Sequence, residues 1–325
     1  MKILVVGGIG YIGSHMLKRF KETNYDIEIL DNLSSGQKEN TQNYKLHVCD
    51  LSDKETVYKI LSEQNYDLVM HFAASINVEE SYYDPKKYRQ NNVINTINLL
   101  ECMRDLKINK FIFSSSAAVY GEPEHLPITE LHTFNPVNPY GNTKAEVENT
   151  LKNYEESCGL KYVSLRYFNA CGAHHDGTIG EMHDPETHLI PLVLQVANGR
   201  KKHISVFGDD YPTPDGTCVR DYVHVMDIVE AHILAMENLM STNKSQVFNI
   251  GNNKGFSVNQ IIQMAKEITK VDIPFKIQGR RKGDPAELIA DNKKIINLLN
   301  WNPKYSDLET IVKSAWNWEK KVKIK

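Results

Sequence analysis

The chain has 325 residues with 38 basic and 41 acidic side chains, so its formal net charge is only −3. This balance excludes a strong basic field for nucleic acid, and no apolar run approaches the roughly 18–20 residues of a membrane helix. The five cysteines are scattered and odd in number, which argues against a disulfide framework and predicts a cytoplasmic location. The length exceeds the needs of one small core, so we expect two substructures.

Short apolar runs alternate with segments of helical spacing through the first half of the chain. This alternation predicts an α/β fold, a Rossmann-like doubly wound parallel sheet with helices on both faces. Right-handed crossovers would place the carboxyl ends of the strands along one edge, where ligands bind. The expected strands are 2–7, 27–30, 45–49, 67–72, 110–114 and 162–168, and the expected helices are 12–23, 53–64, 86–106 and 140–158.

The sequence changes character after residue 169. Polar, turn-rich segments at 172–188 and 207–219 separate short elements that follow no repeat. We therefore predict a dinucleotide-binding Rossmann domain over 1–169 and a smaller, partly interleaved substrate-binding lobe over 170–325. Some segments of the lobe are expected to return to the first domain.

A glycine-rich turn ends the first expected strand and begins a helix. In Gly8-x-Gly10-x-x-Gly13, the missing Cβ atoms let a pyrophosphate approach the free N–H groups of the helix amino terminus. Asp31 ends the next apolar run, where a carboxylate can bind the adenosine ribose and repel a 2′-phosphate. The pattern predicts NAD rather than NADP. The alternative is a plain glycine turn and a solvated aspartate.

Two further strand ends are expected at the same edge of the sheet. Asp50 and Leu51 follow the third strand, and 72–74 (Phe-Ala-Ala) follow the fourth. Asp50 can pair with the adenine amino group, and the small alanines leave room for the cofactor. Each can also be a simple strand-end residue, and Asp50 can cap the helix that follows it.

Tyr140 and Lys144 lie one helical turn apart, so both side chains share a helix face. A phenol with a pKa near ~10 is a poor base, and a neighbouring cation favours the phenolate. The run Ser114-Ser115-Ser116 ends the fifth expected strand, where a hydroxyl can share a proton with Tyr140. At least one of these serines is expected only to form hydrogen bonds with the backbone of the loop. Together with the glycine turn, these residues predict redox chemistry at a hydroxyl-bearing carbon.

Several motifs carry a resemblance to known proteins along essentially the whole chain. Those in the first half resemble the extended short-chain dehydrogenase/reductase superfamily, and those in the second half resemble its UDP-glucose 4-epimerase family. The first group is 7–15, 30–33, 71–74, 113–121, 139–144 and 165–169, and the second group is 207–225 and 279–286.

The resemblance implies a tightly held NAD and a UDP-hexose substrate. UDP-glucose and UDP-galactose would interconvert through a 4-keto sugar that turns over and is reduced on its other face. Tyr140 would take the proton of the sugar O4, Ser116 would assist, and Lys144 would hold the nicotinamide ribose and tune Tyr140. The family also implies a homodimer formed through the 86–106 and 140–158 helices.

Position by position, the motifs assign residues to two ligands. The expected cofactor contacts are Gly7, Gly10, Tyr11, Ile12, Gly13, Asp31, Asn32, Asp50, Leu51, Phe72, Ala73, Ala74, Asn91, Ser114, Tyr140, Lys144 and Phe168. The expected substrate contacts are Ser116, Tyr140, Asn169, Leu189, Phe207, Arg220, Arg281, Asp284 and Leu288.

Arginines suit a diphosphate because the guanidinium donates two hydrogen bonds and is always charged. The alternative for Arg220 is a structural ion pair with Asp221. Arg280 and Arg281 can also form a solvated face, and only Arg281, which matches the motif, is assigned to the nucleotide.

Three positions depart from the family pattern. Ile76 stands where many relatives have lysine, so one polar contact would be absent, and His188 replaces an asparagine that precedes Leu189. Leu288 occupies a position where relatives restricted to plain hexoses tend to have tyrosine. Because a smaller side chain leaves room for a 2-acetamido group, we expect the N-acetylated UDP-sugars to be accepted too.

Other enzyme classes are alternatives. A nucleotide-sugar dehydratase or decarboxylase on the same scaffold is the closest, but a dehydratase usually has a Thr-Asp-Glu run where this chain has Ser116-Ala117-Ala118. A net oxidoreductase and a non-catalytic NAD-binding protein are further alternatives.

A polar segment in the second half raises the question of a metal site. Its spacing lacks a helical His-x-x-x-His pair, so we expect a solvated loop and no metal. The residues concerned are His174, His175, Glu181, His183, Asp184 and His188.

Overall fold

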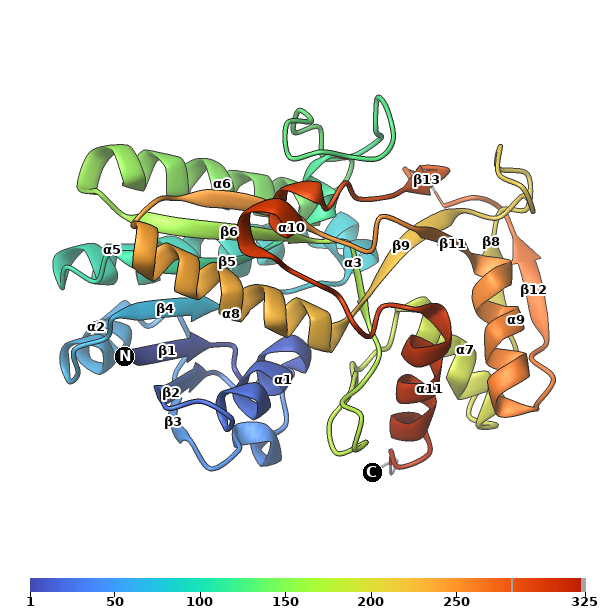
Figure 1. Ribbon diagram of the computed structural model, residues 1–325, viewed down its shortest axis with the longest axis horizontal. Helices are drawn as coiled ribbons and strands as arrows, with labels where there is room; N and C mark the ends of the chain where they lie inside the picture. Colours follow the sequence, from blue (N-terminus) through green and yellow to red (C-terminus); the bar gives the residue numbers. More distant parts are fainter. Residues whose placement is uncertain (282, 323–325) are drawn as a thin grey trace. The chain divides into compact units, whose positions relative to one another are not determined.

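The computed structural model describes residues 1–281 and 283–322, which form two compact units (Figure 1). The first unit contains Met1–Gly121, Thr133–Arg166 and Ala231–Phe248. The second contains Glu122–His132, Tyr167–Glu230 and the described residues from 249 onward. The chain therefore passes between the units several times, and each unit is assembled from separated segments.

A seven-stranded sheet forms the centre of the first unit. Its strands are β1 (Lys2–Val6), β2 (Asp26–Asp31), β3 (Lys45–Val48), β4 (Leu68–His71), β5 (Lys110–Ser116), β6 (Lys161–Tyr167) and β10 (Gln246–Ile250). They lie in the order β10-β6-β5-β4-β1-β2-β3, and β1 pairs in parallel with both β2 and β4. The order reverses direction at β1, which is the arrangement of a doubly wound sheet, so the predicted Rossmann-like fold is confirmed.

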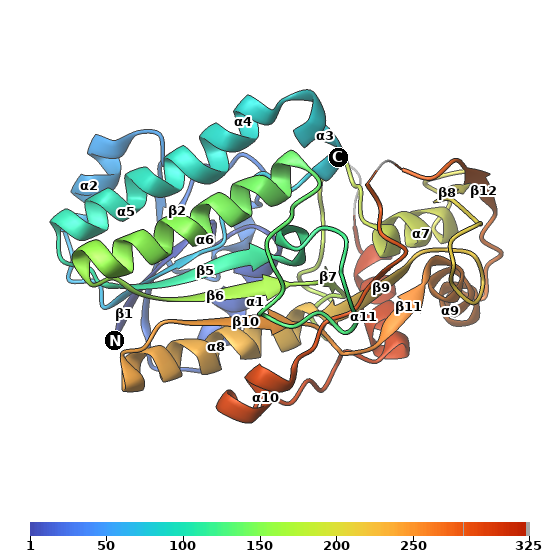
Figure 2. The ribbon, with the colours of Figure 1, turned by 90° about the horizontal axis from the view of Figure 1, so that it is seen from above.

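Helices cover both faces of this sheet. They are α1 (Tyr11–Phe20), η1 (Lys38–Thr41), α2 (Lys54–Ser62), α3 (Val78–Tyr83), α4 (Pro85–Arg89), η2 (Gln90–Ile94), α5 (Asn95–Asp105), η3 (Ala117–Val119), α6 (Pro139–Cys158) and α8 (Val225–Thr242). In Figure 2, α2, α5 and α6 lie along one face, with α1 and α8 on the other. Leu4, Phe111 and Leu151 are fully buried in the core of this unit.

Local sequence signals set the ends of the helices. Asn138 caps α6 by accepting a hydrogen bond from the Gly141 N–H at 2.7 Å, and Pro139 opens the first turn. Gly159 ends this helix in the left-handed conformation, with φ 73°. The helix expected over 86–106 is present as a continuous helical segment over 85–105, in which the π turn η2 lies between α4 and α5.

Among its described residues, the second unit contains two small sheets and four complete helices. Its elements are β7 (Asn169–Cys171), α7 (Leu189–Ala197), β8 (Ile204–Phe207), β9 (Val219–His224), β11 (Gly255–Ser257), α9 (Val258–Thr269), β12 (Phe275–Gln278), β13 (Glu287–Leu288), α10 (Lys293–Leu299) and α11 (Leu308–Glu319). One sheet has the order β11-β9-β13 with β7 also paired to β9, and β8 pairs with β12 in the other. Val193, Ile261 and Val312 bury the contact between α7, α9 and α11.

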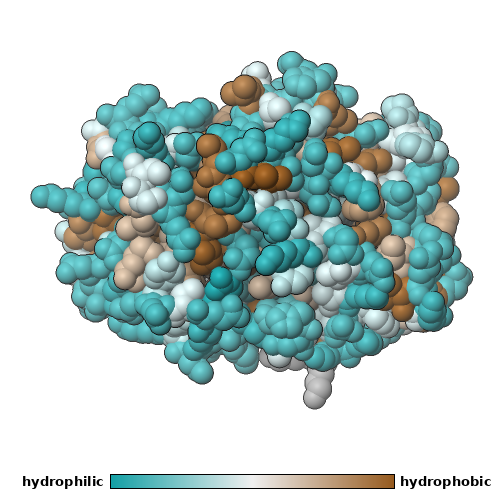
Figure 3. Space-filling model, viewed as in Figure 1, coloured by the Kyte–Doolittle hydropathy of each residue, from teal (hydrophilic) through white to brown (hydrophobic). Residues whose placement is uncertain are grey.

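The surface drawn in Figure 3 is mostly hydrophilic, with hydrophobic residues in scattered groups. Among the described residues, no helix is both long enough and apolar enough to cross a membrane.

A buried ion pair joins α6 to the sheet of the first unit. Glu148 and Arg166 form two hydrogen bonds, at 2.9 and 2.7 Å, and their side chains are 1% and 4% exposed. Arg166 also donates to the Tyr120 hydroxyl at 2.7 Å, and Ser115 donates to Glu148 at 2.5 Å. Breaking such a pair leaves an uncompensated buried charge, which is far costlier than losing a surface pair.

Glu148→Ala is therefore expected to lower the free energy of unfolding by about 3–5 kcal/mol, measured by urea denaturation. Glu309→Ala is the matched control, because it removes the same carboxylate from a surface pair, that with Lys313 on α11, away from the helices expected at the dimer contact. The control is expected to change stability little. Equal losses in the two variants would contradict the role given to the buried pair.

Candidate active site

The glycine turn holds three backbone segments in close contact. Gly7 has φ 74°, and a Cβ there would lie 2.4 Å from the Ala73 nitrogen. A Cβ on Gly13 would lie 2.4 Å from the Gly7 oxygen. Gly10 precedes the first turn of α1 and supplies no side-chain cap. The amino terminus of a helix attracts an anion through its N–H groups and its dipole. The turn therefore fits a dinucleotide pyrophosphate.

Asp31 ends β2 and fixes the loops beside the glycine turn. It is 8% exposed and accepts hydrogen bonds from the N–H groups of Ile9 at 3.2 Å and Leu33 at 2.9 Å. Burial raises the pKa of Asp31 above its usual range, although these N–H groups lower it. Leu33 is left-handed, with φ 62°, a strained conformation for leucine that is common at binding sites.

Asp50 supports the neighbouring loop. It accepts a hydrogen bond from the Asn32 amide at 2.6 Å and another from the Ser52 N–H at 2.8 Å. The cap of α2 is Asp53, whose carboxylate accepts from the Thr56 N–H at 3.1 Å. The capping role considered for Asp50 is therefore wrong, and its carboxylate instead orients Asn32, another predicted cofactor contact.

The segment after β4 is tied to the π turn. Asn91 donates to the Ser75 hydroxyl at 3.0 Å, and the Ser75 N–H donates to Asn92 at 2.8 Å. Ile76 follows with 38% of its surface exposed. Asn92 could not be predicted, because a π turn leaves no periodic signal, and Ser75 is recognised only through its hydrogen bonds to this turn. The turn is what places Asn91 beside the Phe-Ala-Ala strand end.

The three serines at the end of β5 have three different environments. The Ser114 carbonyl accepts a hydrogen bond from Lys144 Nζ at 2.8 Å. Ser115 belongs to the buried Glu148 pair, and the Ser116 hydroxyl accepts from the Ala118 N–H at 3.2 Å. Ser116 also stabilises the ionised form of Tyr140 by hydrogen bonding. The structure thus brings Ser116, Tyr140 and Lys144 together.

Burial has the largest effect on the pKa values of both Tyr140 and Lys144. Burial raises the pKa of Tyr140, and the hydrogen bond from Ser116 only partly offsets it. Burial also lowers the pKa of Lys144 to about 7, although Glu148 opposes this. Lys144 Nζ lies 5.9 Å from the centre of the Tyr140 ring. Desolvation therefore dominates the pKa of Tyr140 in these residues by themselves, and the expected lowering of that pKa by Lys144 stays a prediction.

A close backbone approach holds α6 against the end of β5. A Cβ on Gly141 would lie 2.4 Å from the Ala118 oxygen, so only glycine fits between Tyr140 and Lys144 at this contact. The sequence Pro-Tyr-Gly-Asn-Thr-Lys thus combines two functional side chains with the residue that lets their helix approach.

The second unit gathers most of the predicted nucleotide contacts. Asp284 contacts Arg281 at 2.9 Å and Arg220 at 3.4 Å, and the Arg281 guanidinium lies 4.8 Å from the centre of the Phe207 ring. Leu288 of β13 is in register with Arg220 of β9. The cluster presents two cations around one carboxylate, a suitable site for a diphosphate.

Other predicted contacts lie on neighbouring elements of the same unit. Asn169 is in register with Tyr222 on β9, and Leu189 is the first residue of α7. Phe168 is 8% exposed, and its N–H donates to the Ile250 carbonyl at 3.0 Å. Their ligand contacts remain predictions.

The structural ion pair considered between Arg220 and Asp221 is replaced by other contacts of both residues. Asp221 is fully buried and accepts hydrogen bonds from the backbone N–H groups of Asn252, Asn253 and Ala290. It therefore organises loops, and Arg220 pairs with Asp284 instead.

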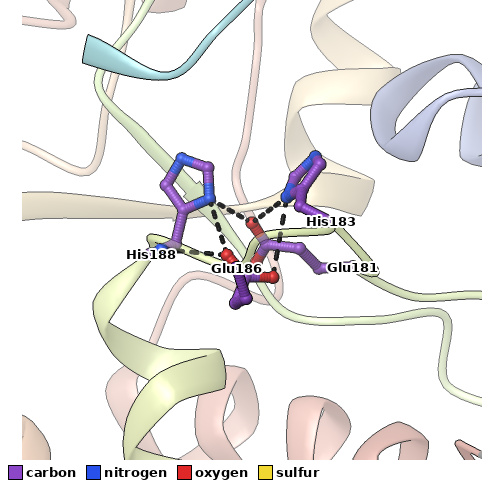
Figure 4. Close-up of side chains that lie close together, drawn as sticks. All are labelled: Glu181, His183, Glu186 and His188. Carbon is purple, nitrogen blue, oxygen red and sulfur yellow. Dashed lines mark hydrogen bonds and ion pairs between the residues drawn. The ribbon is translucent and has the colours of Figure 1, made fainter. Parts of the chain in front are cut away.

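Part of the polar loop, around Glu181 and Glu186, is buried rather than solvated. The side chains of Glu181 and Glu186 are each 5% exposed and contact His183 and His188 (Figure 4). These carboxylates raise the pKa of His183 to about 9 and that of His188 to about 10, against the opposing effect of burial. The expectation of a solvated loop is therefore wrong for Glu181, whereas His175 and Asp184 are exposed as expected. Glu186 was not predicted to belong to this group, because the fold of the loop brings it there.

The parallel sheet, the glycine turn and the Tyr140–Lys144 pair define an extended short-chain dehydrogenase/reductase. A family model described as GDP-mannose 4,6 dehydratase matches residues 4–314. The UDP-glucose 4-epimerase of Halalkalibacterium halodurans is 48% identical over 320 residues, covering 98% of this chain and 96% of the relative. The chain therefore belongs to the UDP-glucose 4-epimerase family.

Solved structures agree with this assignment. UDP-glucose 4-epimerase from Brucella ovis in complex with NAD has a TM-score of 0.94 and 44% identity, with 97% of each chain covered. The UDP-Glc/GlcNAc 4-epimerase of Campylobacter jejuni has a TM-score of 0.87 and 44% identity, with 99% of each chain covered.

Gly13→Ala is expected to lower the free energy of unfolding by about 1–3 kcal/mol, because the added methyl group has no room beside backbone atoms. Gly10→Ala is the matched control, since its Cβ would meet only the Gly7 oxygen, at 3.5 Å. Urea denaturation of both variants tests this, and an equal loss of stability in the two would count against the close packing described for Gly13.

Proposed function

We propose that this protein interconverts UDP-glucose and UDP-galactose in an NAD-dependent reaction. The observation that carries the proposal is the convergence of Ser116, Tyr140 and Lys144 at the end of β5, in the unit that also holds the glycine turn. High identity to UDP-glucose 4-epimerases over nearly the whole chain supports the same reaction.

Tyr140 is the proposed acid–base group. As a phenolate it would remove the proton of the sugar C4 hydroxyl while C4 loses its hydride, leaving a 4-keto sugar and a neutral phenol. It would return that proton to O4 when the ketone regains a hydride. Bound NAD supplies the acceptor and then the donor of the C4 hydride, together with the positive charge of its oxidised ring. Ser116 would bond the same sugar oxygen and share the proton.

Lys144 is proposed to control the charge of Tyr140. Its pKa of about 7 lets it be ionised in a substantial fraction of molecules at neutral pH. A protonated Lys144 would favour the phenolate, whereas a neutral one would leave the phenol protonated. The contact with the Ser114 carbonyl fixes the ammonium beside the reaction centre.

The second unit is proposed to bind UDP. Arg220 and Arg281 would bind the diphosphate, with Asp284 holding both guanidinium groups in place, and Phe207, Asn169 and Leu189 would contact the rest of the nucleotide. A firmly held UDP and a loosely held sugar would let the 4-keto sugar turn over without dissociating. The first unit would correspondingly be the NAD-binding domain.

A dehydratase is less well supported, although the matched family model has that description. Elimination of water needs an added acid and base, and Ser116 is followed here by the apolar Ala117 and Ala118. Retention of the Tyr140–Lys144 pair likewise disfavours a non-catalytic NAD-binding protein.

We also infer a homodimer and a cytoplasmic location. The family supports the dimer, which would use the helical region 86–106 and helix α6. The five free cysteines suit a reducing compartment.

Tyr140→Phe is expected to reduce kcat by about 10²–10⁴-fold, because it removes the proton-transferring group while keeping the ring. The assay would follow conversion of UDP-galactose without added cofactor, together with the NAD content of the purified protein. NAD content should be unchanged, and Tyr58→Phe on the exposed side of α2 should behave like the parent. Full activity in Tyr140→Phe would refute the proposed base.

Leu288 is proposed to admit an N-acetylated sugar, as the relation to a UDP-Glc/GlcNAc epimerase suggests. The protein should therefore convert UDP-N-acetylglucosamine as well as UDP-glucose. Leu288→Tyr should reduce the first activity by at least about tenfold by steric exclusion and spare the second. Chromatographic separation of the products tests both expectations, and a parent protein that converts only UDP-glucose would reject this assignment.

A further inference from the structure

We propose that Glu181, His183, Glu186 and His188 form a binding site for one divalent metal ion of the zinc type. One nitrogen from each histidine and one oxygen from each glutamate lie within 4.8 Å of one another. Figure 4 shows the four side chains turned toward a common centre from a single short segment. The site uses none of the residues proposed for catalysis, so it does not depend on the proposed reaction.

The distances within the cluster suit tetrahedral coordination. Bonds of about 2.0–2.2 Å from zinc to nitrogen or oxygen separate neighbouring ligand atoms by roughly 3.3–3.6 Å. His183 Nδ1 lies 3.3 Å from a Glu181 oxygen and 3.6 Å from a Glu186 oxygen. His188 Nδ1 lies 2.7 and 3.2 Å from oxygens of the same two carboxylates. The two histidines contact different oxygens of Glu186, and the four ligand atoms lie within 4.8 Å of one another. Side-chain shifts on the order of 1 Å would bring one oxygen of each carboxylate to the tetrahedral separations.

The charge and the donor atoms of the four side chains also suit a divalent metal ion. Without a metal, protonated His183 and His188 balance the charge of the two carboxylates. One divalent ion bound by two neutral histidines would supply the same charge of +2, so the ion would replace two protons. Imidazole nitrogen and carboxylate oxygen are both ordinary zinc ligands.

Contacts outside the four side chains hold the ligands in position. One Glu186 oxygen accepts hydrogen bonds from the N–H groups of Thr187 at 2.8 Å and His188 at 2.9 Å. The Trp318 indole donates to the Glu181 carbonyl at 2.8 Å, and a Cβ on Gly180 would lie 2.3 Å from the Trp318 ring. Such supporting contacts orient metal ligands before the ion binds.

Four protein ligands leave no open position, so the ion would have a structural role rather than a catalytic one. It would join Glu181 to His188, the residue immediately before α7. Leu189, the first residue of that helix, is a predicted nucleotide contact. The metal would therefore stabilise the segment that leads to this part of the nucleotide site.

The test uses the full chain after removal of metals with a chelator. Calorimetric titration with Zn²⁺ should show one equivalent bound per chain, and the midpoint of thermal unfolding should rise. Titration with Co²⁺ should give the intense visible bands of tetrahedral cobalt and saturate at one equivalent.

Glu186→Gln and His183→Gln should each weaken Zn²⁺ binding by at least about tenfold, because each removes one ligand. His125→Gln is the matched control, since His125 is exposed and lies outside the cluster, and it should bind like the parent. The cobalt spectrum of the unaltered chain keeps the proposal testable if a variant does not fold. Absence of saturable binding, an octahedral cobalt spectrum, or binding unaffected by Glu186→Gln would overturn the proposal.

Discussion

The hydrogen bond from Lys144 to the Ser114 carbonyl is the interaction on which the proposed catalytic centre depends. It fixes the second turn of α6 at the carboxyl end of β5, and with it Tyr140, one turn earlier on the same helix. Because the amine is buried, its pKa falls to about 7 while that of Tyr140 rises. Two groups poised in this way respond to any further positive charge, so ligand binding and proton affinity are linked at this position.

In the second unit, one carboxylate orders two arginine side chains before any ligand binds. Arg220 and Arg281 share Asp284 and are ordered by it, although only Arg220 is buried. A diphosphate that meets these arginines does not have to order two flexible side chains, which reduces the entropic cost of binding. The carboxylate thus weakens the local positive field but improves its geometry.

The sequence predicted the parts of the fold that follow from periodicity. The alternation of apolar runs and helical segments located the strands of the Rossmann sheet up to β6, and the glycine turn and Tyr140–Lys144 spacing located the candidate site. Three features could not be predicted from the sequence. The π turn that positions Asn91 has no periodic pattern, the pKa of Tyr140 depends on burial, and the convergence of Glu186 with two histidines depends on the path of a loop.

The position of β10 in the first sheet has a consequence for synthesis of the protein. This strand, formed by Gln246–Ile250, is the edge neighbour of β6, although the second unit contributes most of the chain between them. On the ribosome, the sheet cannot be completed until much of the second unit has already emerged. Neither half of the gene would encode an independently finished domain, so a split at the middle of the sequence would leave β6 as an exposed edge prone to aggregation.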